Sequence, residues 1–181
     1  MAKAYAAFFR NVNLGRPRSP SRAQLEAAFL TAGATAVANV RSNGTVAFDA
    51  PDPAAARRVL EGATAELGAV CGLVEPGCVR PLAALKALPW AKAYAGIDPG
   101  SVFEFTVSFS CSVDPPVLEL PLSSARGDAV VLWAEGGDVL SVTRKVMAGP
   151  GSPNALLERA TGTPYTSRTL GTVRLVLAKH G

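Results

Sequence analysis

Histidine is almost absent from this sequence of 181 residues: its single copy is His180, the residue before the last. A Ser-His-Asp triad needs a histidine as general base, and His-rich metal sites and the H-E-x-x-H motif need more than one. These hydrolase and metalloenzyme classes are therefore excluded or nearly so.

Two phosphate-binding motifs are also missing. The sequence has no G-x-x-x-x-G-K-[ST] loop and no G-x-G-x-x-G segment after a strand, so nucleoside triphosphatase and dinucleotide-binding functions lack their phosphate cradle. The 14 Asp and Glu residues pair only across turns, where such side chains bond to their own backbone. We expect a protein without an identifiable catalytic apparatus, with no metal and no cofactor.

Long hydrophobic runs and a secretory leader are lacking as well. No apolar run approaches the roughly 18–20 residues that cross a bilayer, so no membrane association is expected. The apolar block in residues 1–9 runs into Arg10 without a cleavage site, and Cys71, Cys78 and Cys111 are an odd set without a C-x-x-C pair. We expect a cytoplasmic protein with free, structural thiols rather than a catalytic cysteine.

The first part of the chain nevertheless has the pattern of a folded α+β unit, and 49% of the whole sequence is hydrophobic. The expected elements are a strand at 3–9, a polar loop at 10–20, a helix from Ser19-Pro20 to Gly33, strands at 36–41 and 45–49 around Ser42-Asn43-Gly44, a helix from Asp52-Pro53, and a strand at 69–74. Their order is β-α-β-β-α-β, which is the ferredoxin-like or alpha-beta plait plan.

The second part repeats this order without its first helix. A strand at 102–109, a hairpin of 129–133 and 139–143, and a helix from Ser152-Pro153 to Ala160 are expected, whereas Pro115, Pro116 and Pro121 exclude a helix between Cys111 and Arg126. The fold prediction is two tandem ferredoxin-like units: residues 1–75, a linker at 76–100 with a short helix, and residues 101–181. Residues 170–177 fit a strand and a helix equally well.

Four segments carry a resemblance to a known family: Arg10-Asn11-Val12-Asn13-Leu14-Gly15, the hairpin Arg41–Phe48, the helix Asn154–Glu158 and the segment Thr166–Thr172. Together they resemble the domain of unknown function 1697 family, an uncharacterised bacterial family, and the first segment is similar to its Arg-Gly-Ile-Asn-Val-Gly signature. The resemblance implies two tandem α/β units and a helix after Thr169, and it implies no biochemistry. Asn11 replaces a family Gly, and Leu170 and Gly171 replace a Trp and an Asn; if these positions form a ligand site in relatives, that site is altered or lost here.

Arginine and asparagine provide the concentrated polar chemistry. The formal charge is +4, Arg outnumbers Lys by 13 to 5, and the first acidic residue is Glu26. Guanidinium groups suit phosphate, and Asn adds selective hydrogen bonds. The candidate ligand-binding residues are Arg10, Asn11, Asn13, Arg16, Arg18, Arg41, Ser42, Asn43, Arg168 and Thr169. The hypothesis is non-catalytic binding of an anionic, phosphate-bearing small molecule; the simpler interpretation is a solvated loop whose Asn side chains bond to local backbone.

Two other functions stay open. A ferredoxin-like sheet is also the RNA-recognition plan, and Tyr5, Phe9 and Phe48 are candidate base-stacking aromatics, although burial in the core suits Phe9 and Phe48 better. Such a module would bind nucleic acid weakly through Arg16 and Arg18. Alternatively, open strand edges and the Pro-rich residues 113–121 would support a structural homo-oligomer.

Overall fold

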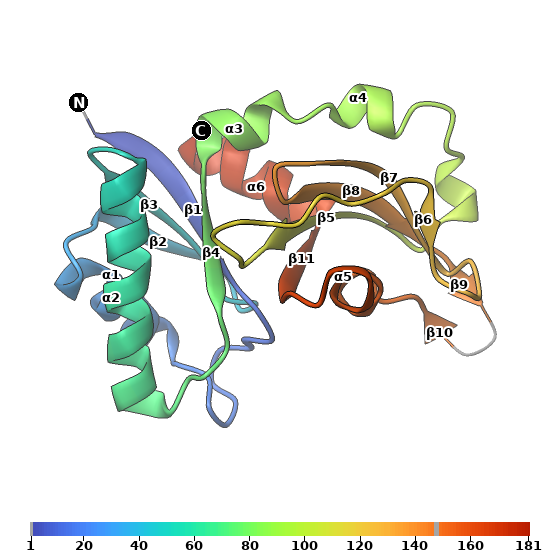
Figure 1. The fold of residues 1–181 in the computed structure, drawn as a ribbon. Helices are drawn as coiled ribbons and strands as arrows, with labels where there is room; N and C mark the ends of the chain where they lie inside the picture. Colours follow the sequence, from blue (N-terminus) through green and yellow to red (C-terminus); the bar gives the residue numbers. More distant parts are fainter. Residues whose placement is uncertain (1, 147–148) are drawn as a thin grey trace. The chain divides into compact units, whose positions relative to one another are not determined.

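Antiparallel sheets organise this α+β chain in the computed structural model, which describes residues 2–146 and 149–181 (Figure 1). The described residues fall into two compact units: unit 1 comprises Met1–Ala87 with Arg174–Gly181, and unit 2 comprises Leu88–Val173. Six α-helices are found in this described part.

Unit 1 contains a four-stranded sheet in the order β2-β3-β1-β4, with every neighbouring pair antiparallel. Its elements are β1 (Lys3–Phe9), α1 (Arg22–Thr31), β2 (Thr35–Arg41), β3 (Thr45–Ala50), α2 (Pro53–Cys71), β4 (Gly77–Pro81) and α3 (Leu82–Ala87). Through β4 this is the predicted β-α-β-β-α-β order.

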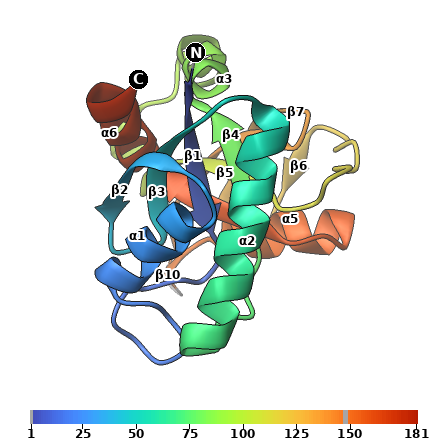
Figure 2. The same cartoon turned by 90° about the vertical axis from the view of Figure 1, so that its left-hand side faces the viewer.

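The core of unit 1 is an apolar sheet face under two helices. Figure 2 shows α1 and α2 side by side on this face. Phe48 of β3 stacks on Tyr5 of β1 at 5.9 Å between ring centroids and meets Phe29 of α1 at 5.2 Å. Because Tyr5, Phe9 and Phe48 are each at most 1% exposed, the predicted burial of Phe9 and Phe48 is confirmed and none of these three rings is open for base stacking.

Unit 2 contains a five-stranded antiparallel sheet in the order β11-β5-β8-β7-β6 and a small β9-β10 ribbon. Its elements are α4 (Trp90–Ala93), the 3-10 helix η1 (Pro99–Ser101), β5 (Glu104–Ser110), β6 (Leu122–Ser123), β7 (Ala129–Glu135), β8 (Asp138–Thr143), β9 (Lys145–Val146), β10 (Gly149–Pro150), α5 (Pro153–Thr161) and β11 (Tyr165–Thr169), followed by α6 (Leu170–His180), which runs on into the residues of unit 1. No helix interrupts residues 111–126, as the three prolines predict.

The face of this sheet that α5 covers is rich in hydroxyl groups. Thr106 Oγ1 and Ser141 Oγ lie 2.7 Å apart across β5 and β8, and Ser108 Oγ lies 2.6 Å from Ser167 Oγ on β11. Ser167 Oγ in turn donates to Asn154 Oδ1 of α5 at 2.6 Å. Polar contacts therefore help to hold α5 on the sheet.

Several predicted boundaries are wrong. No strand forms at 69–74, because α2 continues to Cys71 and ends at Gly72, whose φ of 70° is the left-handed conformation of a helix C-cap. The strand that completes the sheet is β4, which lies inside the predicted linker 76–100. A proline is acceptable at the end of such an edge strand.

Two further corrections concern helices. The cap of α1 is Ser21 rather than Ser19, because Gln24 three residues later completes a capping box with Ser21. Residues 170–177 are helical, which agrees with the family resemblance and resolves the ambiguous periodicity. The unit boundaries differ from 1–75 and 101–181 accordingly, and residues 174–181 group with unit 1.

Candidate functional site

Arg10 and Asn11 follow β1 directly, and both bond to one carboxylate. Arg10 Nη1 lies 2.8 Å from Glu75 Oε2, and Asn11 Nδ2 donates to Glu75 Oε1 at 3.2 Å. Asn11 has a φ of 51°, a conformation that Gly and Asn adopt more readily than other residues. Glu75 thus bonds to two of the predicted ligand-binding side chains and holds the start of the loop in place.

The loop from Asn13 to Pro20 is tied together by its own backbone. Gly15 N–H donates to Pro20 O at 3.0 Å and Ser19 N–H to Arg16 O at 3.0 Å, while Asn13 N–H donates to Ser19 Oγ at 3.2 Å. Val12, just before it, is buried in the core of unit 1. The loop therefore has a defined shape although most of its side chains are exposed.

The β2–β3 hairpin turn lies against this loop. Leu14 N–H donates to Ser42 O at 2.7 Å and Phe9 N–H to Gly44 O at 3.0 Å. Asn43 Oδ1 accepts from the Thr45 hydroxyl at 2.8 Å, so this amide stabilises the turn. Gly44, with a φ of 69°, allows the close approach: a Cβ there would lie 2.8 Å from Val12 Cβ.

Arg16, Arg18 and Arg41 form the exposed cationic part of this arrangement. All three side chains are exposed, and none makes a hydrogen bond or ion pair with another described residue. The Leu14–Ser42 hydrogen bond and a Cα spacing of 3.8 Å per residue place the Cα atoms of Arg16 and Arg41 within about 18 Å of each other. We call Asn13–Arg18 with Arg41–Asn43 the arginine loop surface.

Arg168 and Thr169, the other two predicted residues, belong to unit 2. Arg168 is 6% exposed, and its Nη1 donates to Thr166 Oγ1 at 2.8 Å and to Ser167 O at 2.7 Å. Strand alternation puts Arg168 and Thr166 on the face opposite to Ser167. Thr169 Oγ1 caps α6 by accepting from Thr172 N–H at 3.1 Å. Both side chains thus have structural roles in unit 2.

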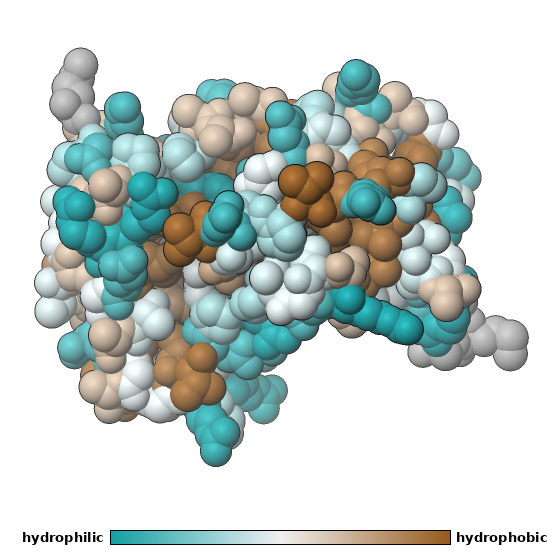
Figure 3. Space-filling model, in the orientation of Figure 1, coloured by the Kyte–Doolittle hydropathy of each residue, from teal (hydrophilic) through white to brown (hydrophobic). Residues whose placement is uncertain are grey.

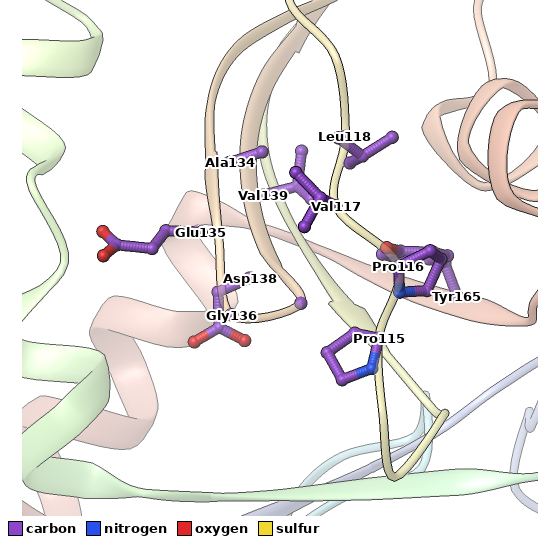
Figure 4. Close-up of a pocket in the computed structure, with 11 residues that line it drawn as sticks. Pro115, Pro116, Val117, Leu118, Ala134, Glu135, Gly136, Asp138, Val139 and Tyr165 are labelled. Carbon is purple, nitrogen blue, oxygen red and sulfur yellow. The ribbon is translucent and has the colours of Figure 1, made fainter.

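Sequence reasoning missed two pockets in unit 2. The first, of about 240 Å³, lies between residues 115–118 and the end of the β7–β8 hairpin (Figure 4). Its wall is mainly apolar, and Glu135 extends away from the proline segment. The Pro-rich stretch at 113–121 is the sequence signal that could have indicated this pocket. Figure 3 shows apolar surface gathered near β6 and β7, and Val113 and Val117 are more than 90% exposed.

The second pocket, of about 210 Å³, lies at the end of the hydroxyl-rich face of unit 2. It is lined by Phe103, Glu104, Thr106, Thr143, Pro150, Gly151, Pro153, Ser167, Arg168 and Thr169. Burial raises the pKa of Glu104 above its ordinary value. No local motif marks this pocket in the sequence, because its walls come from β5, β8, β10, α5 and β11, which only the fold of unit 2 brings together.

A protein-family model described as "Protein of unknown function (DUF1697)" matches residues 2–120. The chain belongs to the DUF1697 family. This match includes the arginine loop surface, whereas the resembling segments at 154–158 and 166–172 lie beyond it. No match was found among curated proteins.

Among solved structures, this DUF1697 member is similar to a conserved bacterial protein from Streptococcus pneumoniae. The two chains share 17% sequence identity and superpose with a TM-score of 0.62, and 98% of each chain is covered. At this identity the likeness concerns the fold.

Two searches of the described residues complete the survey of the DUF1697 chain. No helix among them has the length and apolarity to cross a membrane. No group of three or more His, Cys, Asp or Glu side chains among them is placed to hold a metal ion.

Proposed function

We propose that the chain binds phosphate-bearing ligands, without catalysis, at the arginine loop surface of unit 1. The observation that carries this proposal is the set of exposed guanidinium groups of Arg16, Arg18 and Arg41, which have no bonding partner among the described residues. A guanidinium presents a planar fork of donors that matches phosphate oxygens.

The shape of the loop supports this function. Backbone hydrogen bonds and the buried Val12 hold the loop before a ligand arrives, so less conformational entropy is lost on binding. Asn13 and Ser42 are exposed beside the arginines and can add hydrogen bonds. Arg10 and Asn11 act as positioning residues in this proposal, since Glu75 already holds both.

Nucleic acid is the second candidate ligand, and the exposure of the arginines favours it. Exposed cations bind a polyphosphate backbone by releasing condensed counterions, whereas a small phosphate is usually enclosed. The buried aromatic residues argue for contacts with the backbone rather than with stacked bases. Assembly through strand edges is less well supported at β2, whose pairing with β3 is irregular and whose Asn39 N–H bonds to Glu26.

The test compares two double variants of equal charge. R16A/R18A removes cations from the arginine loop surface, and R57A/R58A removes two exposed cations from α2. Binding is measured by fluorescence anisotropy with single-stranded oligo(U) and by thermal shift with inorganic phosphate and nucleoside monophosphates. We expect R16A/R18A to weaken binding at least tenfold and R57A/R58A to change it less than threefold.

The ligand arms separate the two candidates. Salt-sensitive binding of oligo(U) without a shift from the small phosphates identifies a nucleic-acid-binding surface. A saturable shift from a monophosphate that R41A abolishes identifies a small-molecule site. Equal losses in R16A/R18A and R57A/R58A would refute a specific surface.

The proposal also includes an evolutionary component for the fold. We infer that the two units are tandem ferredoxin-like copies, because β7, β8, β5 and β11 follow one another as β2, β3, β1 and β4 do. In this interpretation the second copy has exchanged its first helix for residues 111–126 and added β6. A cytoplasmic location remains part of the proposal.

A further inference from the structure

The second pocket of unit 2, lined by Glu104 and called the Glu104 pocket from here on, contains both hydrogen-bonded and unpartnered polar groups. Thr106 Oγ1 lies 2.7 Å from Ser141 Oγ, Ser167 donates to Asn154, and Thr169 caps α6. These hydroxyl groups are held by the protein itself and form a fixed wall.

The side chains of Glu104 and Thr143, in contrast to these hydroxyl groups, have no hydrogen-bond partner among the described residues. They are cross-strand partners on β5 and β8, so their side chains share one face and their Cβ atoms lie about 4.5–5.5 Å apart. The Glu104 carboxyl makes no hydrogen bond or ion pair with a described residue. Thr143 is 3% exposed, and its Oγ1 has no hydrogen-bond partner in the described part of the chain.

The chain supplies no counter-cation to this pair among its described residues. The Arg168 guanidinium bonds to Thr166 and Ser167 O, on the other side of the strand. Arg144 and Lys145 follow Thr143 directly, but both are exposed and form no described ion pair. A partly buried carboxylate without an internal cation is an energetic cost that a bound cation would relieve.

We propose that the Glu104 pocket binds a small protonated amine, whose ammonium group sits between Glu104 and Thr143. An ammonium group has three donors and no acceptor, which complements a carboxylate and a hydroxyl oxygen that lack donors. At about 210 Å³ the pocket is smaller than the 300–1,000 Å³ typical of drug-sized ligands, so a compact molecule fits it. This site is independent of the proposed phosphate-binding function, since it lies in unit 2 and selects the opposite charge.

The probe pair is n-butylammonium and 1-butanol, which have the same alkyl chain and differ in charge. Each is titrated into ¹⁵N-labelled full-length protein near pH 7, and amide chemical shifts are followed. We expect n-butylammonium to shift the amides of Glu104, Thr106 and Thr143 saturably, with at least tenfold tighter binding than 1-butanol.

Variants of the two key residues complete the test. E104Q keeps the size of the side chain and removes its charge, and we expect at least a tenfold loss of n-butylammonium affinity. T143V keeps the shape of the side chain and removes its hydroxyl, and we expect a loss of threefold or more. E119Q, at an exposed glutamate of unit 2, is the matched control and should bind like the original protein.

Three results would overturn the proposal: equal binding of 1-butanol, unchanged affinity in both E104Q and T143V, or saturable shifts confined to residues outside the pocket. If E104Q loses the dispersed spectrum of a folded protein, T143V decides the outcome.

Discussion

The sheet face under α1 and α2 in unit 1 and the sheet face under α5 in unit 2 share a strand order but differ in chemistry. In unit 1, Tyr5 pairs with Phe48 and Ala7 with Val46 across β1 and β3. In unit 2, Thr106 pairs with Ser141 across β5 and β8. The face in unit 1 is stabilised by apolar burial under α1 and α2. The face in unit 2 relies partly on hydrogen bonds between hydroxyl groups under α5.

The two faces also differ in the helices that cover them: α1 and α2 lie on the face in unit 1, and α5 is bonded to the face in unit 2. Apolar faces of helices and sheets need to be covered, and two helices cover the sheet in unit 1. In unit 2, Thr106, Ser108 and Ser141 are at most 4% exposed, and their hydroxyl groups lie within hydrogen-bond distance of partners across the strands, so this polar face is ordered and buried. Both pockets described above lie in unit 2.

The largest expected loss of stability follows a substitution in the apolar face of unit 1. Phe48→Ala should reduce the stability of unit 1 by about 3–5 kcal/mol, because it removes a ring packed on Tyr5 and Phe29. Ser141→Ala should reduce that of unit 2 by about 1 kcal/mol, since Thr106 Oγ1 retains its bond to Ser141 O. Native-state hydrogen exchange measures each unit separately, and Leu30→Ala, at an exposed apolar residue of α1, is the control. Equal losses for Phe48→Ala and Ser141→Ala would contradict the comparison.

Glycine substitutions in the two hairpin turns should cause a smaller loss of stability. Gly44→Ala in unit 1 should cost about 2–4 kcal/mol, because a positive φ and a 2.8 Å approach to Val12 Cβ both oppose the methyl group. Gly136→Ala in unit 2 should cost about 1–2 kcal/mol, because it has a φ of 58° but no atom within 4 Å. Urea denaturation followed by circular dichroism measures both. A larger loss of stability for Gly136→Ala than for Gly44→Ala would show that the close packing of Val12 on Gly44 does not constrain the hairpin turn of unit 1.

The smallest effect is a pH dependence of opposite sign in the two units. The Asn39 N–H, donating to Glu26 Oε1 at 3.0 Å, holds the pKa of Glu26 below its ordinary value, so the ionised carboxylate stabilises unit 1. That contribution is present above a pH of about 4.3 and is lost as the pH falls through the folded-state pKa.

Burial raises the pKa of Glu104, so ionising this carboxyl costs stability in unit 2 as the pH rises through its folded-state pKa. At pH 7, E26Q should therefore destabilise unit 1 and E104Q should stabilise unit 2. Both differences should shrink toward pH 3. Hydrogen exchange at pH 7 and denaturation at several pH values check these signs, and the same sign in both units would disprove the interpretation.

Local signals in the sequence predicted much of the fold. Asn43-Gly44 and Gly136-Gly137 marked both hairpin turns, and Asp52-Pro53 and Ser152-Pro153 marked the starts of α2 and α5. The errors at 69–74 and at the cap of α1 occurred where two local interpretations competed. In each case the deciding factor was a bond or strand pairing beyond the periodic pattern.

The candidate site was less predictable. The loop residues from Arg10 to Arg18 and the hairpin residues Arg41–Asn43 were correctly identified as exposed or loop positions, but no pattern indicated that Glu75, more than 60 residues away, would hold Arg10 and Asn11. Likewise, the burial of Arg168 depends on Thr166 and on the pairing of β11 with β5.

By itself, the sequence determined the α+β class, the hairpin turns, the starts of α2 and α5 and the absence of a helix at residues 111–126, because glycine, proline and capping side chains act on the few residues around them. The tertiary structure alone decided which polar groups are satisfied. Arg10 and Arg16 are alike in sequence, yet one bonds to Glu75 and the other faces solvent. Glu104 and Thr143 meet because β5 and β8 pair in register. Charge and hydrogen bonding act through space, so their outcome is set by long-range strand pairing.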